Sequence, residues 1–270
     1  MAGEALSGSR YPACARGGGG PPAFGAVQKA VVAGLQGGSA AVGGVAAGRP
    51  LARGALLKWF AGVLDESGHA AARRLAAAAA DFYLAGGTAL ALRLGHRVSL
   101  DLDLFSDRNA LGAAERQALL RGLTASGPVK IREEKDGTCH LDLGGTSVSL
   151  FHYAYPALGR CERWSGLAVA SLDDIAAMKL SAVLGRGSKK DFIDLHELCR
   201  RLGLERVMKA GGRKFSRHRD FPLQAARALV YFEDADKEAM PRMLASTTWE
   251  EVKSYFARAI PAYVKGRLMR

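Results

Sequence analysis

The chain has 270 residues, room for one ordinary domain or two small ones, and 49% of them are hydrophobic. No run of 18 or more apolar residues lacks a charge or a glycine, so the sequence predicts no membrane span. The net charge of +12 favours a polyanionic partner, nucleic acid or NTP, although a generally basic proteome would explain it as well. Four widely spaced cysteines with no CxxC pair argue against a zinc site or disulfides and indicate a reducing cytoplasm.

The N-terminal segment differs in composition from the rest. Its first 50 residues hold 13 of the 33 glycines, and the only acid before Asp65 is Glu4. The run GGGGPP at 17–22 suits no regular element. We expect residues 1–55 to be a disordered extension, or to precede the true start of translation.

The pattern of the remaining chain predicts an α+β fold. The expected elements, in chain order, are a helix over 56–80, a strand over 82–84, a helix over 88–94 ended by Gly95, a strand over 99–105, a helix over 113–123, strands over 139–143 and 147–153, and helices from 171 onward. Gly144-Gly145 is a two-residue hairpin signal between the last two strands. A small mixed-sheet core over 56–160 should therefore precede a helical domain over 161–270.

The strand predicted over 99–105 carries two aspartates on one face. Side chains alternate along a strand, so Asp101 and Asp103 lie together, roughly 6–7 Å apart, opposite the leucines between them. Two carboxylates this close repel each other, and a divalent cation such as Mg²⁺ relieves the repulsion. The alternative is an amphipathic strand whose acidic face is solvated.

A glycine turn precedes this strand by about a dozen residues. Gly86 and Gly87 allow a close backbone approach to phosphate, the following helix offers free N–H groups, and Thr88 adds a hydroxyl. The alternative is a tight turn with Thr88 as an N-cap.

A lysine lies on the apolar face of the helix predicted after Ser171. Lys179 shares that face with Leu172 and Ile175, so its charge needs a partner, either a phosphate or an aspartate pair. The alternative is a lysine whose ammonium reaches solvent at the edge of the apolar stripe.

A short basic loop follows this helix. Arg186, Ser188 and Lys189 suit contacts to phosphate, but they equally suit a solvated loop in which Ser188 and Asp191 form a helix cap.

Taken together, these blocks resemble the AbiEii/AbiGii nucleotidyltransferase family, which belongs to the DNA-polymerase-β-like superfamily and supplies many bacterial toxins. The blocks are 84–92 with Arg97 and Ser99, 100–106, 171–180 and 185–195, with a weaker match at 231–235, so the resemblance covers about residues 82–264.

The resemblance implies that the chain moves a nucleoside monophosphate from an NTP to an acceptor. Asp101 and Asp103 are then the Mg²⁺ ligands, Gly86, Gly87 and Thr88 hold the triphosphate, and Lys179, Arg186, Ser188 and Lys189 contact or neutralise it. In toxins of the family the acceptor is RNA, often a tRNA end, and an antitoxin protein is the cognate partner.

One departure from the superfamily concerns its third carboxylate, because the strand expected to carry it, over 147–153, has no acid. If Gly144-Gly145 forms the hairpin, Asp142 shares a face with His140 and Ser149 and is a candidate replacement. An exposed hairpin aspartate is the plain alternative. Two other functions therefore stay open, namely transfer to a small molecule or protein, and a catalytically degenerate module that only binds nucleotide or RNA.

Overall fold

A computed structural model describes residues 59–268 of the chain. Residues 1–55, the expected extension, lie outside the described residues. The helices are η1 (Ala61–Val63), α2 (Glu66–Ala78), α3 (Gly86–Leu94), α4 (Ala113–Thr124), α5 (Leu172–Gly185), α6 (Lys189–Leu202), α7 (Leu204–Lys214), α8 (Phe221–Ala228), α9 (Glu233–Asp236) and α10 (Trp249–Leu268). The strands are β1 (Tyr83–Ala85), β2 (Leu102–Ser106), β3 (Lys130–Lys135), β4 (Thr138–Leu143), β5 (Thr146–His152), β6 (Glu162–Trp164) and β7 (Leu167–Val169).

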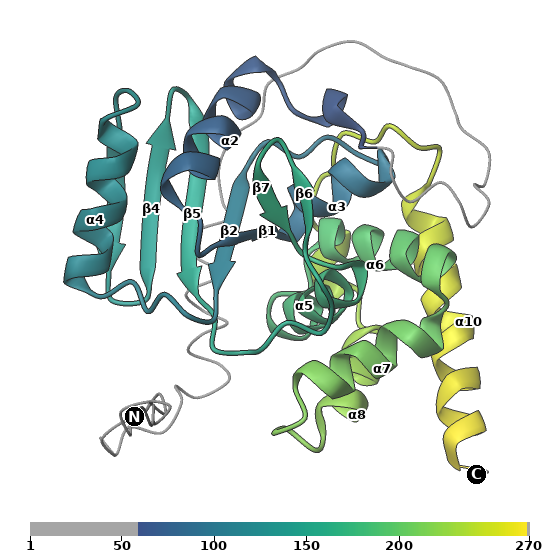
Figure 1. The fold of residues 1–270 in the computed structure, drawn as a ribbon. Helices are drawn as coiled ribbons and strands as arrows, with labels where there is room; N and C mark the ends of the chain where they lie inside the picture. Colours follow the sequence, from purple (N-terminus) through teal and green to yellow (C-terminus); the bar gives the residue numbers. More distant parts are fainter. Residues whose placement is uncertain (1–58, 269–270) are drawn as a thin grey trace, which may run out of the picture.

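Within the described residues these strands form one mixed sheet in the order β3-β4-β5-β2-β1-β7-β6. Strand β2 lies near its centre, parallel to β5 and antiparallel to β1, while β1 and β7 are parallel. The C-terminal helices gather beside the sheet, away from the edge that carries β4 and α4 (Figure 1). The predicted α+β architecture, a mixed sheet followed by helices, is confirmed.

Helix α3 connects the sheet to the C-terminal helices. It contacts β1 and β2 as well as α5 and α6. It begins directly after β1 at Gly86 and ends at Gly95, whose φ of +62° provides the left-handed residue expected there. Side chains from the sheet and from α5 and α6 therefore meet around α3.

The hairpin prediction is confirmed, including its register. Gly144 and Gly145 have φ of +65° and +92°, the conformation of a two-residue turn with positive φ at both positions. Strands β4 and β5 pair so that His140 lies opposite Ser149 and Asp142 opposite Ser147.

The structure differs from the prediction at four places. The strand expected over 99–105 begins only at Leu102, so Asp101 lies just before it. The sheet continues to Val169, because the three-residue strands β6 and β7, too short to show a periodic pattern, extend it past β1. The helix expected over 56–80 begins only at Glu66, because the Asp65 carboxylate caps it by accepting a hydrogen bond from Gly68 N at 2.8 Å. Strand β3, a charged strand at the sheet edge, has no counterpart among the predicted elements.

Within residues 59–268, no helix combines the length and the apolar character needed to cross a bilayer.

Candidate active site

The two aspartates lie at the start of the central strand. Asp103 is in β2, paired with Ala85 on one side and Ser149 on the other, whereas Asp101 comes just before the strand begins. All five residues of β2 are buried, and Asp103 is only 6% exposed. The alternative of a solvated acidic face is therefore wrong for this strand.

The environment of Asp101 and Asp103 disfavours the ionised form of both carboxyl groups. Burial and the neighbouring carboxylate of Asp101 raise the pKa of Asp103 to about 6, and burial also raises the pKa of Asp101. The Oδ1 atom of Asp103 is buried and has no hydrogen-bond partner among the described residues. Two crowded carboxylates with an unsatisfied oxygen fit a divalent cation that takes its other ligands from substrate phosphates.

The glycine turn packs directly on this carboxylate. Gly86 has φ of +69°, and a Cβ there would lie 2.9 Å from Asp103 Oδ2. A Cβ on Gly87 would overlap the Arg97 guanidinium and lie 3.0 Å from Ser99 Oγ. Both positions therefore need glycine, and the amino end of α3 begins beside Asp103.

Thr88 is inside helix α3 and is not its N-cap, which is Ala85. Its Oγ1 lies within hydrogen-bonding distance of the Ser99 carbonyl, at 3.1 Å, and of the Asp101 carbonyl, at 2.5 Å. The hydroxyl thus fixes the segment that leads into β2, and through it the position of Asp101.

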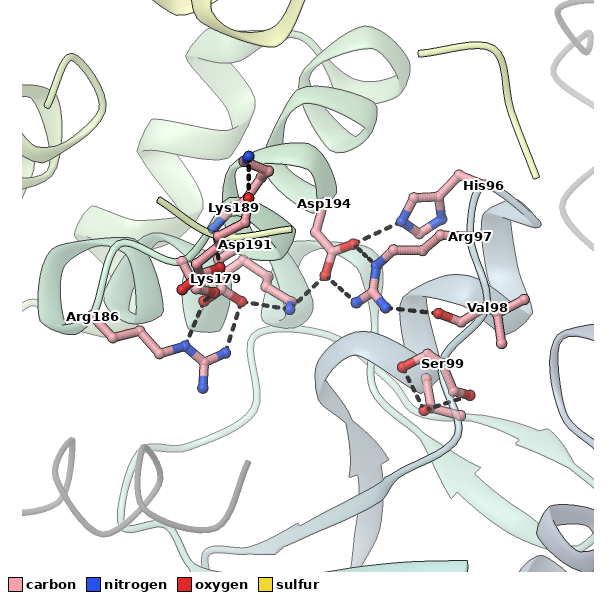
Figure 2. A network of polar contacts seen from close by, with 12 residues as sticks. His96, Arg97, Val98, Ser99, Lys179, Arg186, Lys189, Asp191 and Asp194 are labelled. Atoms are coloured by element: carbon pink, nitrogen blue, oxygen red, sulfur yellow. Dashed lines mark hydrogen bonds and ion pairs between the residues drawn. The ribbon is translucent and has the colours of Figure 1, made fainter. Parts of the chain in front are cut away.

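A second pair of aspartates, on α6, organises the cations around the site (Figure 2). Asp194 accepts two hydrogen bonds from Arg97, at 2.7 and 2.8 Å, and pairs with Lys179 Nζ at 2.5 Å and His96 Nε2 at 2.7 Å. Burial alone would raise its pKa, but Arg97 and Lys179 hold the pKa of this carboxyl well below its usual range.

Asp191, three residues earlier in α6, also holds cations of the site in place. It accepts two hydrogen bonds from Arg186, at 2.6 and 2.9 Å, another from Lys179 at 2.9 Å and a further bond from the Ser188 hydroxyl at 2.7 Å. Burial would raise the pKa of Asp191, but Lys179 and Arg186 lower it strongly. Figure 2 shows Lys179 lying between the two carboxylates.

Three basic side chains, Arg97, Lys179 and Arg186, thus share two buried carboxylates, so the cations of this network outnumber its acids by one. The charges of Arg186 and Lys179 also lower the pKa of Asp103, against the larger effects of burial and Asp101 that raise it. The excess charge is therefore held, preorganised, near the Asp101–Asp103 pair, where it suits negative charge that develops on phosphate.

The structure brings together most of the predicted site residues, but not Lys189. That side chain contacts the Glu238 carbonyl and lies over the Trp249 ring, 5.3 Å from its centroid. The charge of the next residue, Lys190, lowers the pKa of both Asp101 and Asp103, although burial has the larger, opposite effect. Lys190 is thus the lysine of this basic segment that acts on the carboxylates.

Asp142 is also not brought to the carboxylate pair. It accepts hydrogen bonds from Arg132 at 2.6 Å and from Gly145 N at 2.8 Å, and both lower its pKa. Strand β5 lies between it and β2, which places it about 10 Å away by strand spacing. The residue beside Asp103 in register is Ser149, whose Oγ lies 3.0 Å from His140 Nδ1.

Sequence reasoning missed Arg97, His96, Lys190 and Asp194 as members of the site. The available signal was the spacing of Asp191 and Asp194, which places two acids on one face of a helix that follows a lysine on an apolar face. In the described residues no group of three or more histidine, cysteine or acidic side chains is arranged to hold a metal ion. The candidate ligands are the two carboxylates of Asp101 and Asp103, on the evidence of the unpartnered Asp103 Oδ1 atom and the raised pKa values.

Two comparisons with known proteins identify the family. Residues 71–140 and 163–263 match the family described as nucleotidyl transferase AbiEii toxin of type IV toxin–antitoxin systems. An uncharacterised protein of Aquifex aeolicus is 38% identical over 189 residues, covering 68% of this chain and 89% of its own.

Among solved structures, JHP933 of Helicobacter pylori has a TM-score of 0.45 at 19% identity, covering 76% of this chain and 97% of its own. ANT(2")-Ia, in complex with adenylyl-2"-tobramycin, has a TM-score of 0.44 at 20% identity and covers 57% and 99%. On the family match and the relative, the chain belongs to the AbiEii nucleotidyl transferase family and is a nucleotidyl-transferring enzyme.

Proposed function

We propose that the enzyme transfers a nucleoside monophosphate from an NTP to the end of an RNA, in a Mg²⁺-dependent reaction at the Asp101–Asp103 pair. The acceptor in this proposal is an RNA with a free terminal hydroxyl, with tRNA as the first candidate. The observation that carries the proposal is the unsatisfied, buried Oδ1 atom of Asp103, in a carboxylate that packs against a glycine turn and on which the charges of Arg186 and Lys179 act.

In this proposal the residues of the site have different roles, which follow from their positions. Asp101 and Asp103 would hold a Mg²⁺ ion, and that ion, when bound, would offset negative charge on the triphosphate and on the departing pyrophosphate. Gly86 and Gly87, at the amino end of α3, lie against the same carboxylate and its neighbours, so their N–H groups suit the phosphates.

The cations complete this arrangement. Lys179 and Arg186 are fixed by Asp191, so their charges need no reorganisation when negative charge grows on the transferred phosphoryl group. Ser188 donates its hydroxyl to the same carboxylate and so helps to hold Arg186 in place. We assign Lys190, in place of Lys189, to the phosphates.

We further infer that the enzyme acts as a toxin in the cytoplasm, where NTPs and RNA are present, and that a cognate antitoxin opposes it. Membership of a type IV toxin–antitoxin family supports this inference.

The test uses the full chain with each of the four α-labelled NTPs, Mg²⁺ and total tRNA, and follows label in the RNA on a denaturing gel. We expect label with the parent, a loss of at least about a hundredfold in Asp103→Asn, and no loss in Asp107→Asn. Asp107 is a matched control because it is exposed and follows the same strand.

Two outcomes would contradict the proposal. Label that appears only in a small molecule or in protein would identify a different acceptor. A parent protein that binds NTP and yet shows no Mg²⁺-dependent turnover would be a binding module.

A further inference from the structure

A cleft of about 540 Å³ lies beside the candidate active site, between the carboxyl end of α5 and the region of α8 and α9. A volume of this size suits a nucleotide-sized ligand. Its lining residues include Val183, Arg186, Gln224, Arg227, Tyr231 and Asp234.

Arg186 joins this cleft to the carboxylates. Its Nε and Nη2 atoms bind Asp191, and its charge acts on Asp103. Its third nitrogen, Nη1, has no hydrogen-bond partner among residues 59–268, and Figure 2 shows it without a dashed line. A group in the cleft can therefore reach the same guanidinium whose charge acts on Asp103.

The cleft also carries an aromatic ring and a second cation. Tyr231 is 51% exposed, and its hydroxyl donates to Glu233 at 2.9 Å, so the ring is held in an exposed position. Arg227 is exposed and has no ionic partner in the part of the chain that the structure describes. Asp234, the acid of the cleft, pairs with Lys237 at 3.2 Å.

The neighbouring chain has an excess of positive charge. Residues 200–238, which include α7, α8 and α9, contain ten lysines and arginines against six acids, four of them in or beside α9, and all of the ten except Lys214 are exposed. Such a segment attracts a polyphosphate backbone, whereas it would repel a polycationic small molecule. The charge therefore favours a nucleic-acid strand over a cationic acceptor.

We propose that this cleft binds the terminal nucleotide of the acceptor RNA, with its base stacked on Tyr231 and its phosphate on Arg227. The inference rests on the proposed nucleotidyl transfer, since it places the acceptor end on the far side of Arg186 from the NTP. Aromatic stacking together with a cation is the usual means of holding single-stranded RNA without strict sequence preference.

The test measures equilibrium binding of a fluorescent single-stranded RNA with a free 3′-hydroxyl by anisotropy, with the full chain and without NTP. We expect Tyr231→Ala and Arg227→Gln each to raise Kd for the RNA about tenfold, the loss expected for one stacked base or one phosphate contact. Tyr231→Phe should bind like the parent because it keeps the ring. Arg258→Gln, an exposed arginine on α10, is the matched control for charge.

NTP binding, measured by calorimetry on the same variants, separates the two substrates. We expect it to stay within about twofold of the parent value, since the exposed side chains of Tyr231 and Arg227 lie on the acceptor side. Weaker NTP binding with unchanged RNA binding would assign the cleft to the NTP and overturn the proposal. Unchanged binding of both ligands would overturn it as well.

The anisotropy readout does not depend on transfer, so it stays informative if the proposed function fails. A parent protein that labels no RNA, while its RNA affinity still falls in Tyr231→Ala, would contradict nucleotidyl transfer and support the subsite. Melting temperatures of the variants should match that of the parent, because both side chains are exposed.

Discussion

The chain contains two pairs of aspartates that behave in opposite ways. Asp191 and Asp194 are fully compensated by cations and have strongly lowered pKa values. Asp101 and Asp103 lie nearby with raised pKa values, and one oxygen of Asp103 has no partner among the described residues. The first pair stabilises the fold and positions cations, whereas the negative charge of the second pair is not fully compensated by nearby cations. The difference shows that partners, and not residue type, decide which carboxylates are available to a ligand.

The largest effect on stability is expected from a substitution in the compensated pair. Asp194→Asn leaves Arg97 and Lys179 buried with one carboxylate fewer, which should cost about 3–5 kcal/mol of the free energy of unfolding. Urea denaturation of the parent and the variant measures this difference. A change below about 1 kcal/mol would show that the buried network contributes little to stability.

The second prediction concerns the uncompensated pair and has the opposite sign. Because the folded pKa of Asp103, about 6, lies above the ordinary value of 3.8, this carboxyl contributes most to stability below about pH 4, and that contribution is lost as pH rises through 6. Asp103→Asn cannot ionise and so avoids this loss of stability. At pH 7 without metal, we expect the free energy of unfolding of the variant to equal that of the parent or to exceed it by up to about 3 kcal/mol.

Denaturation curves between pH 4 and 7 check this, with the exposed Asp107→Asn as control. Asp191 and Asp194, whose pKa values are lowered, should instead contribute stability above about pH 4 and lose it as pH falls. A variant of Asp103 that loses stability at pH 7 would point to a structural role for this carboxylate.

A third, smaller effect tests the contact between the glycine turn and Asp103. Gly86→Ala combines positive φ with a Cβ that would lie 2.9 Å from the carboxylate, so we expect a loss of about 2 kcal/mol. Gly144→Ala is the matched control, because its φ is +65° and nothing lies within 4 Å of the added Cβ. It should lose only about 1 kcal/mol, and equal losses in thermal melts would argue against the contact.

The smallest effect is expected at Asp142. Asp142→Asn breaks a hairpin contact and a partly exposed ion pair with Arg132, which should cost less than about 1 kcal/mol. NTP turnover should fall only slightly, because this carboxylate lies away from Asp103. A loss of turnover as large as that of Asp103→Asn would show that Asp142 reaches the site during the reaction.

Much of the fold can be predicted because its signals are local. The alternation around Asp103, the turn at Gly144-Gly145 and the left-handed residue Gly95 each depend on a few neighbouring residues. Strand β1 is equally short, but an apolar run and the glycine turn after it mark it in the sequence. Strands β6 and β7 cannot be predicted, because no such local signal accompanies them and their stability comes from pairing with each other and with β1.

The residues of the site also differ in whether the sequence reveals them. Asp101 and Asp103, at the start of β2, and the glycine turn are visible as motifs, and so is Lys179 on its apolar helix face. The choice between Lys189 and Lys190 cannot be made from sequence, because it depends on which side of α6 meets Trp249 and Glu238. The role of Arg97 depends on Asp194, 97 residues later in the chain, which no local pattern reveals.

That separation in sequence has a consequence for synthesis of the protein. The ribosome makes Asp101, Asp103 and the rest of β2 early, but the sheet is incomplete until Val169 can pair beside Leu84. Arg97 likewise has no counter-ion until Asp194 has emerged. Arg186 and Lys179 also gain their fixed positions only with Asp191. A nascent chain therefore carries the carboxylate strand without the ordered cations, and the complete charge arrangement arises only when translation has passed α6.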